Sequence, residues 1–542
     1  MSRLEAVLSA VVIFAVALVV RIVVASVVVF PVPEDTAYYF GVARNLLDGH
    51  GLVSDALWSY QTPPLQFPRP AFEVWLPLPT FLAAIPMAIA GATFAAAQVS
   101  SVLVGSLVPV LAWRLGADVA ADRGLPAGRA RVLAVGSGLT SAVYLPLVLH
   151  STLPDSTMLF AALAIAACLL MTRLVRAGAG LRLTDPRLIG LGVLIGLAAL
   201  TRNEATFIGL AWLIVAWRIP GLDRRRRLLL IVVPAAIAIA IFAPWAIRDW
   251  IVFGNPLPGQ ALANALSVEG FDIFAWNDPP KLSRYLAVGP ARLLEMRVEG
   301  FGHNFLNVLV LTGIPVAVVG LIGLWSTIRL AAVRSLAIVA LTTFFFTSFF
   351  FPVSTTWGTY LHAAGPAHVL LVVSALVLLD ALIERVGRIR GWTKPVAWLG
   401  PALTIFGSLL FMVALMPNFG DQSRGVQAKY QALTMQMTAA GLPIEAQGPI
   451  ITDFPIWLAE STGHEALALP DETPADVVDL AAHFPGTTLL IIGGEERGRW
   501  PAILDAGGPG TECFHEIDIG RPAEARLADA LGKTRVFRLA CP

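Results

Sequence analysis

The sequence is poor in charged residues. Asp, Glu, Lys and Arg make up 14% of the 542 residues, whereas 56% of the residues are hydrophobic. Soluble globular proteins carry about 25% charged residues, so this composition excludes a soluble fold for most of the chain. The mean hydropathy of +0.73 is typical of a polytopic membrane protein.

Cysteine is also scarce, and the charges nearly balance. Only three Cys residues are present, and no Cys-x-x-Cys or Cys/His spacing predicts a structural metal site. Cys513 and Cys541 flank predicted strands near the C-terminus and can form a disulfide bond there. The formal net charge of +1 argues against a nucleic-acid partner. The sequence contains no internal repeat, low-complexity tract or heptad array.

Long apolar segments recur through most of the chain. A helix needs about 20 mostly apolar residues to cross the hydrocarbon core of a bilayer. Candidate segments lie at 6–30, 72–91, 93–114, 131–150, 157–176, 188–203, 205–217, 228–247, 303–328, 335–351, 365–384 and 396–416. The first segment is too long for the apolar region of a signal peptide and lacks a cleavage site, so we expect a retained membrane anchor.

Clusters of Arg set the predicted topology. They lie at 123–131, 173–187, 218–227, 329–334 and 385–390. Short cytoplasmic loops are enriched in Arg and Lys, so all five clusters should be cytoplasmic. That condition holds only if residues 72–91, which Pro77, Pro79 and Pro86 interrupt, form a juxtamembrane or re-entrant helix. We therefore expect eleven spans in the plasma (inner) membrane, with a cytoplasmic N-terminus.

Two outer loops and a polar tail complete the predicted organisation. Residues 1–416 form a transmembrane catalytic domain, with a first outer loop at 31–92 that carries juxtamembrane helices and a long outer loop at 248–302. Residues 417–542 alternate predicted strands and helices, which indicates a small α/β domain. The span count places this C-terminal domain on the extracytoplasmic side.

The predicted topology brings polar residues that are far apart in the sequence to one outer face. Glu34 and Asp35 follow the first span, and Asp155 ends a turn that begins at His150. Further along the chain, the same face receives Arg202, Arg248, Tyr360 and His362. Ionisable groups at a bilayer surface are costly to desolvate and are often functional.

These residue types suit the transfer of a sugar from a phosphate. A carboxylate must take the proton of the attacking group, and we expect Asp35 to be this base, with Glu34 beside it. Asp155 would orient the acceptor. If a divalent metal such as Mg²⁺ or Mn²⁺ is bound, Glu34, Asp35 and Asp155 are its candidate ligands.

The basic and hydroxyl groups suit the departing phosphate. The guanidinium groups of Arg202 and Arg248 match phosphate oxygens, and Tyr360 and His362 can donate further hydrogen bonds. Each candidate also has a structural alternative. Arg202 can simply form an ion pair with Glu204, and Arg248 can do so with Asp249. Asp155 can cap the next helix, and His362 can be an interfacial histidine. The acidic pair Glu34 and Asp35 can lie in a solvated loop.

An ordered set of motifs carries a resemblance to a known superfamily. The set comprises Glu34-Asp35-Thr36-Ala37-Tyr38-Tyr39, Gly49-His50-Gly51, Phe67-Pro68-Arg69-Pro70, Asp155, Leu200-Thr201-Arg202-Asn203-Glu204 and Pro244-Trp245-Ala246-Ile247-Arg248-Asp249. Over residues 6–416 the chain resembles the GT-C glycosyltransferases, particularly the protein O-mannosyltransferases and the aminoarabinose lipid A transferases. Two motifs depart from the pattern: Glu precedes Asp in the acidic pair, and Pro68-Arg69-Pro70 stands where His-Pro-Pro is common.

The resemblance implies a function. A monosaccharide would move from a polyprenyl-phosphate donor to a protein, lipid or glycan acceptor on the extracytoplasmic side, with inversion. Asp35 would then be the base and Asp155 the acidic residue of the second outer loop. A polyprenyl-linked sugar flippase or transporter is one alternative, although it predicts inverted repeats and charges at mid-membrane, which we do not find. A lipid-linked glycan polymerase or ligase is the other.

Overall fold

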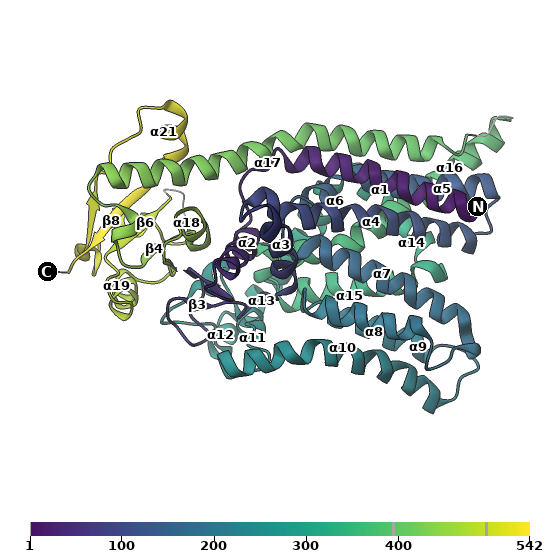
Figure 1. The fold of residues 1–542 in the computed structure, drawn as a ribbon, viewed down its shortest axis with the longest axis horizontal. Coiled ribbons are helices and arrows are strands. Elements are labelled where there is room, and N and C mark those ends of the chain that lie inside the picture. Colours follow the sequence, from purple (N-terminus) through teal and green to yellow (C-terminus); the bar gives the residue numbers. More distant parts are fainter. Residues whose placement is uncertain (1, 393–395, 494–496, 542) are drawn as a thin grey trace.

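The computed structural model describes residues 2–392, 396–493 and 497–541, and most of them are helical. Seven helices in these ranges are long and apolar enough to cross a membrane. They are α1 (Arg3–Ala25), α4 (Phe94–Asp122), α7 (Ser156–Ala177), α10 (Arg224–Phe253), α15 (Arg334–Phe350, preceded by a short 3-10 turn), α16 (Gly365–Ile389) and α17 (Leu399–Ala439). Figure 1 shows these helices gathered in a bundle, and the chain is an integral membrane protein.

The other four predicted spans are helical but shorter or bent. They are α5 (Ala127–Val143), α8 (Pro186–Ala199), α9 (Ala205–Trp217) and the pair formed by α13 (Gly289–Gly302) and α14 (Val316–Thr327). The last pair is joined through a π-helical segment and bent by 114°, so it counts at most as one further span. The helical membrane fold is confirmed, whereas the number of eleven crossings stays a prediction.

The first outer loop contains two helices, α2 (Glu34–Leu47) and α3 (Leu78–Ala90). α3 has 13 residues and contains Pro86. α8 and α9 are about as short, so length alone does not decide a crossing, and the expectation that residues 72–91 do not cross stays a prediction. A short helix, α6 (Leu145–His150), follows α5 and leads into the turn before α7.

Several Arg-rich loops lie at the end of the bundle that carries the N-terminus. Arg131 contacts Glu5 of α1 at 2.8 Å. Arg129, at the start of α5, contacts Asp380 near the end of α16 at 2.8 Å. Figure 1 places the N-terminus at the end of the bundle away from α2 and the sheet. The chain therefore has one Arg-rich end, while the side of the membrane that this end faces stays a prediction.

A six-stranded sheet lies beyond the other end of the bundle. Its strand order is β2 (Ala56–Leu57), β5 (Ala466–Ala468), β4 (Ile450–Thr452), β6 (Leu489–Ile492), β8 (Arg535–Leu539) and β7 (Phe514–Ile517). The first four strands pair in parallel, and β8 is antiparallel to both of its neighbours. The central strands β4 and β6 are fully buried apolar runs, as strands of a parallel sheet are when both faces are covered. The helices of this region are α18 (Pro455–Thr462), α19 (Pro474–His483), α20 (Ala502–Ala506) and α21 (Ala525–Leu531).

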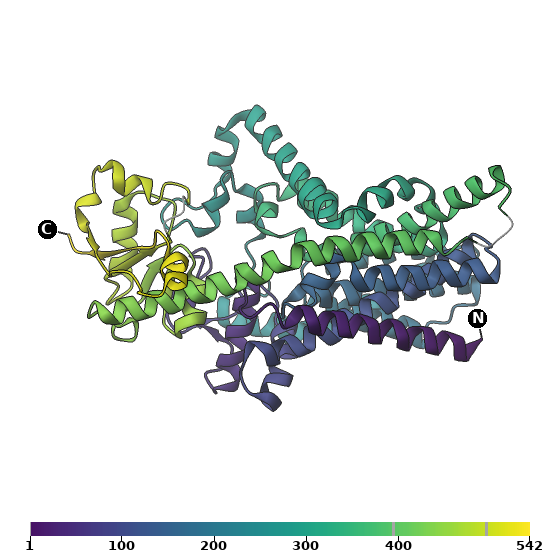
Figure 2. The same ribbon diagram turned by 90° about the horizontal axis from the view of Figure 1, so that it is seen from above.

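Two features connect the sheet to the bundle. α17 is a continuous helix of 41 residues that runs from the bundle to the sheet, as the two perpendicular views show (Figures 1 and 2). β2 belongs to the first outer loop, yet it pairs with β5, with Ala56 opposite Ala466. The predicted boundary at residue 416 thus falls within α17, and the division at this residue into two domains remains a prediction. Cys513 and Cys541 form the disulfide bond that the sequence allowed.

Candidate active site

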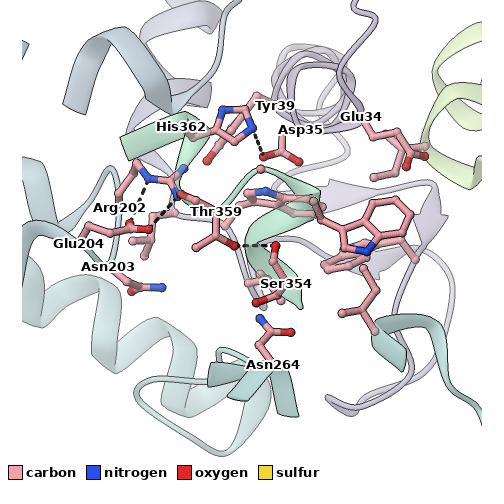
Figure 3. A pocket seen from close by; sticks show the side chains of 18 of the residues that line it. Glu34, Asp35, Tyr39, Arg202, Asn203, Glu204, Asn264, Ser354, Thr359 and His362 are labelled. Carbon is pink, nitrogen blue, oxygen red and sulfur yellow. Dashed lines mark hydrogen bonds and ion pairs between the residues drawn. The ribbon is translucent and has the colours of Figure 1, made fainter. Parts of the chain in front are cut away.

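A cavity of about 200 Å³ lies where the first outer loop, the α8–α9 turn and the long outer loop meet. The segment between α15 and α16 and one residue of α18 complete its wall. Four of the predicted site residues line it: Glu34, Asp35, Arg202 and His362 (Figure 3). The structure therefore brings together residues that the sequence places in three distant segments.

Asp35 is positioned by the start of α2 and by a histidine. It lies in the first turn of the helix, where the helix dipole favours a negative charge. Its Oδ2 atom is 3.2 Å from Nε2 of His362, whose Nδ1 atom is 2.7 Å from the hydroxyl of Thr157. If Thr157 donates to Nδ1, the neutral ring carries its proton on Nε2 and donates it to Asp35. His362 then holds the carboxylate in place.

Asp155 lies behind this pair rather than in the wall of the cavity. It is the N-cap of α7, where its Oδ1 accepts a hydrogen bond from the backbone N–H of Thr157 at 2.7 Å. The capping alternative is thus present in the structure. Its Oδ2 atom accepts a hydrogen bond from Thr36 at 3.4 Å and lies 3.8 Å from Nδ1 of His362. Asp155 therefore reaches the cavity through His362.

Arg202 occupies the turn between α8 and α9 and is held from several sides. Both oxygens of Glu204 accept hydrogen bonds from it at 3.0 Å, so the predicted local pairing exists. It also donates to the hydroxyl of Ser156 at 2.8 Å and to the carbonyl oxygen of Thr359 at 3.3 Å. A guanidinium group fixed in this way is already oriented before an anion enters the cavity.

Two predicted donors lie elsewhere in the part of the chain that the structure describes. Arg248 pairs with Asp249 at 2.9 Å and stacks on the ring of Trp245, so its structural alternative is what the structure contains. Tyr360 is 1% exposed and packs against Phe344. Neither Arg248 nor Tyr360 is among the residues that line the cavity. Both residues were predicted to bind the phosphate because they lie near the end of a span. Position near a span end does not fix the direction of a side chain.

Burial changes the protonation of the groups around the cavity. It raises the pKa of Glu34 to about 7, although the charge of Arg497 opposes the shift. Burial also raises the pKa of Asp35, against the charge of Arg202, and that of Asp155 to about 7. Burial and the charge of Arg202 lower the pKa of His362 to about 3, so its imidazole is neutral. Carboxyl groups that titrate near neutral pH are suited to proton transfer.

One group of side chains has the composition of a metal site. Ligand atoms of His150, Asp155 and His362 lie within 4.8 Å of one another. Nδ1 of His150 is buried and has no hydrogen-bond partner among the described residues. Two imidazoles and a carboxylate fit Zn²⁺, whereas Mg²⁺ and Mn²⁺ prefer a shell of oxygen ligands.

This group differs from the metal ligands that the sequence suggested. Of Glu34, Asp35 and Asp155, only Asp155 belongs to it. Figure 3 shows Glu34 at the right of the view, beyond Asp35 as seen from His362. The signal for His150 was its position in the sequence. His150 and Asp155 are the first and last residues of one turn, and the turn brings their side chains together beside His362.

Sequence reasoning also missed the part of the wall that lacks charged residues. It includes Trp58, Trp75, Asn264, Phe274, Ser354 and Trp357. These residues lie in loops and short helices without a recognisable motif, and only the fold brings them together.

Comparisons with known proteins support the fold. No family model matches the chain, and no curated protein sequence matches it. Among solved structures, ArnT from Cupriavidus metallidurans bound to undecaprenyl phosphate aligns with a TM-score of 0.56 and 14% identity, over 98% of this chain and 99% of that one. The Archaeoglobus fulgidus oligosaccharyltransferase tethered to an acceptor peptide aligns with a TM-score of 0.56 and 15% identity, over 95% and 72% of the two chains. Its complex with Zn and sulfate aligns similarly, with a TM-score of 0.55 and 15% identity over 94% and 71%.

This chain shares the fold of both neighbours. The resemblance noted in the sequence is thereby confirmed at the level of the fold.

Proposed function

We propose that this protein is an inverting glycosyltransferase that moves a single sugar from a polyprenyl-phosphate donor to an acceptor. The observation that carries the proposal is the convergence of Asp35, Arg202 and His362 on one cavity. A general base and an oriented cation are the two groups that such a transfer requires. ArnT is bound to undecaprenyl phosphate, and AglB, an oligosaccharyltransferase from Archaeoglobus fulgidus, is in complex with a dolichol-phosphate. Both complexes support a lipid phosphate as the donor.

The proposed reaction is one displacement at the anomeric carbon. Asp35 accepts the proton of the acceptor's hydroxyl or amine, while the freed electron pair forms the new bond to the anomeric carbon. The bond from this carbon to the phosphate oxygen breaks, and the departing lipid phosphate keeps that electron pair. Arg202 stabilises the charge on the phosphate, since a cation placed beside a departing group lowers the barrier to its departure. A single displacement inverts the configuration at the carbon.

The remaining predicted residues take narrower roles in this proposal. His362 positions Asp35 instead of binding phosphate. Asp155 acts through Thr157, whose backbone N–H donates to it and whose hydroxyl contacts His362. A divalent ion, if bound by His150, Asp155 and His362, would supply positive charge next to the base. Glu34 belongs to the far wall, and no role in phosphate binding is proposed for Arg248 or Tyr360. We keep the extracytoplasmic placement of the cavity and of residues 417–542 as part of the proposal, on the basis of the Arg-rich loops at the opposite end.

Replacement of Asp35 tests the base. Asp35→Asn keeps the shape of the side chain but cannot accept the proton, so we expect turnover to fall by about 100- to 10,000-fold. The assay would follow release of undecaprenyl phosphate from undecaprenyl-phosphate-linked sugars by the full chain in nanodiscs, with membrane extract as the acceptor source. Asp48→Asn, at the exposed end of the same helix, is the matched control. Undiminished turnover in Asp35→Asn would remove Asp35 as the base, and movement of the lipid across vesicles without bond cleavage would favour a transporter.

A further inference from the structure

Four polar atoms on the walls of the cavity have no partner. They are Oε1 of Glu34, Nε1 of Trp58, Oδ1 of Asn264 and Oγ of Ser354, and each is buried without a hydrogen bond among the described residues. A buried polar group without a partner is destabilising, so a fold seldom leaves several of them in one place without a reason. Four such atoms around one cavity indicate a missing polar ligand.

The donors and acceptors among these atoms limit which chemical groups the ligand can carry. The indole N–H of Trp58 only donates, the amide oxygen of Asn264 only accepts, and the hydroxyl of Ser354 does both. The carboxyl group of Glu34 accepts when it is ionised and also donates when it is protonated. A ligand that satisfies all of them needs several groups that each donate and accept. Hydroxyl groups spaced around a ring have this property.

Most of the unpartnered atoms carry no charge. Three of the four belong to uncharged side chains, and Glu34 is the one acid among them. The charge of Arg497 acts on Glu34 and opposes the effect of burial there. An acidic group on the ligand ring would therefore find no counter-charge among these four residues.

An aromatic wall stands beside the polar atoms. The ring of Trp58 lies 4.7 Å from that of Trp75 and 6.2 Å from that of Phe274, which in turn lies 5.7 Å from Trp357. All four rings line the cavity. Apolar rings with a few placed polar groups are the usual lining of a small-molecule site. The C–H face of a sugar ring suits such a wall, while its hydroxyls reach the polar atoms.

The size of the cavity limits the ligand to one ring. Pockets for drug-sized ligands measure about 300–1,000 Å³, and this one measures about 200 Å³. An oligosaccharide would extend well beyond it.

From these observations we infer that Trp58, Asn264, Ser354 and Glu34 form the subsite for one hydroxyl-bearing sugar ring of the donor, without an acidic group on the ring. This inference rests on the proposed function, since Arg202 would hold the phosphate that is attached to the ring. The four residues are then specificity-determining residues, which recognise the sugar and leave the lipid phosphate to Arg202.

The test compares binding of lipids with and without a sugar. The probes are undecaprenyl phosphate and its glucose, mannose and arabinose derivatives, each titrated into the full chain in nanodiscs. We expect wild type to bind at least one sugar-carrying lipid about 10-fold or more tightly than undecaprenyl phosphate. Trp58→Phe, which keeps the ring and removes the N–H, and Ser354→Ala should each weaken binding of that lipid by about 3- to 10-fold, because each removes one hydrogen bond. Their affinity for undecaprenyl phosphate should not change.

Matched controls exist elsewhere in the chain. Nε1 of Trp457 and Oγ of Ser408 are also buried without a partner among the described residues, but neither residue lines the cavity. Trp457→Phe and Ser408→Ala should bind every probe as wild type does, and melting temperatures report whether each variant folds. The inference is overturned if wild type prefers none of the three sugar lipids, or if Trp58→Phe and Ser354→Ala bind the preferred one as tightly as wild type. Failure to bind undecaprenyl phosphate itself would instead count against the proposed function.

Discussion

The Nε2 atom of His362 lies 3.2 Å from Oδ2 of Asp35, although one residue precedes α16 and the other begins α2. Burial lowers the pKa of His362, so its ring is neutral and the contact is a hydrogen bond. An ion pair would require a protonated ring, which burial disfavours. The contact fixes the direction in which the carboxylate can accept a proton. It joins the start of α2 to the segment that precedes α16.

We expect loss of this contact to affect catalysis more than binding. His362→Ala should lower kcat by about 10- to 100-fold with little change in KM, because the base would lose its orientation but remain present. His362→Gln, whose side chain also carries an N–H, should restore part of the loss. His303→Ala is the control, since that histidine bonds only to the nearby Asn307 in the described structure. Equal kcat values for His362→Ala and wild type would argue against a positioning role.

The two candidate phosphate-binding arginines should behave differently. Arg202→Ala, combined with Glu204→Gln so that no buried carboxylate loses its partner, should raise the Kd for undecaprenyl phosphate by about 10- to 100-fold. Arg248→Ala should change it by less than about 3-fold, since Arg248 pairs with Asp249 away from the cavity. Binding measured on the full chain in nanodiscs distinguishes the two. The opposite order of effects would restore Arg248 as the clamp.

Metal content tests the His150 group. Protein purified without chelator should bind about one Zn²⁺ per chain, as measured by mass spectrometry of the metal. His150→Ala and Asp155→Asn should each lower the affinity more than about 10-fold, because each removes one of three ligands. Glu34→Gln, which changes a carboxylate outside this group, should retain the ion. If Zn²⁺ stays bound in His150→Ala, other residues must supply its ligands.

The pH dependence of stability should reflect a buried carboxyl group on α18. Burial raises the pKa of Glu460 to about 8 from an ordinary value of 4.5, despite its contact with Arg44 at 3.0 Å. Between these values the folded chain binds more protons than the unfolded chain. The free energy of unfolding should therefore fall as the pH rises through this window, by up to about 1.4 kcal/mol per pH unit from this group.

Glu460→Gln isolates this contribution. The variant should show a flatter dependence of the melting temperature on pH, with a remaining slope from Glu34, whose pKa burial raises to about 7. Tryptophan fluorescence during heating at several pH values would measure it. Glu445→Gln, which changes an exposed carboxylate, should leave the slope as in wild type. An unchanged slope in Glu460→Gln would contradict the burial argument.

The sequence predicted the membrane fold because hydropathy reports a property of each segment alone. The helices appear where apolar segments were expected, and the alternation near the C-terminus corresponds to strands β4 to β8. The number of crossings is a different matter. α8 and α9 have 14 and 13 residues, so whether each crosses depends on the surrounding helices and the bilayer.

The site was predictable only where charge marked it. Asp35, Arg202 and His362 stand out because a charged or titratable group at a span end is unusual, and the structure brings them together. Arg248 stands out for the same reason but is directed toward Asp249, which spacing cannot reveal. Trp58 and Ser354 carry no such mark, since their importance comes from unmet hydrogen bonds that exist only in the folded chain.

The pairing of Ala56 with Ala466 has a consequence for how this protein is made. A ribosome delivers the first outer loop early and β5 only near the end of translation. Until then the backbone of β2 has no strand beside it, and Trp58, two residues further on, has no fixed place in the cavity. The binding pocket is therefore among the last parts of the molecule to take shape, and a chain cut short before β5 would reach the membrane with its helices but without a completed pocket.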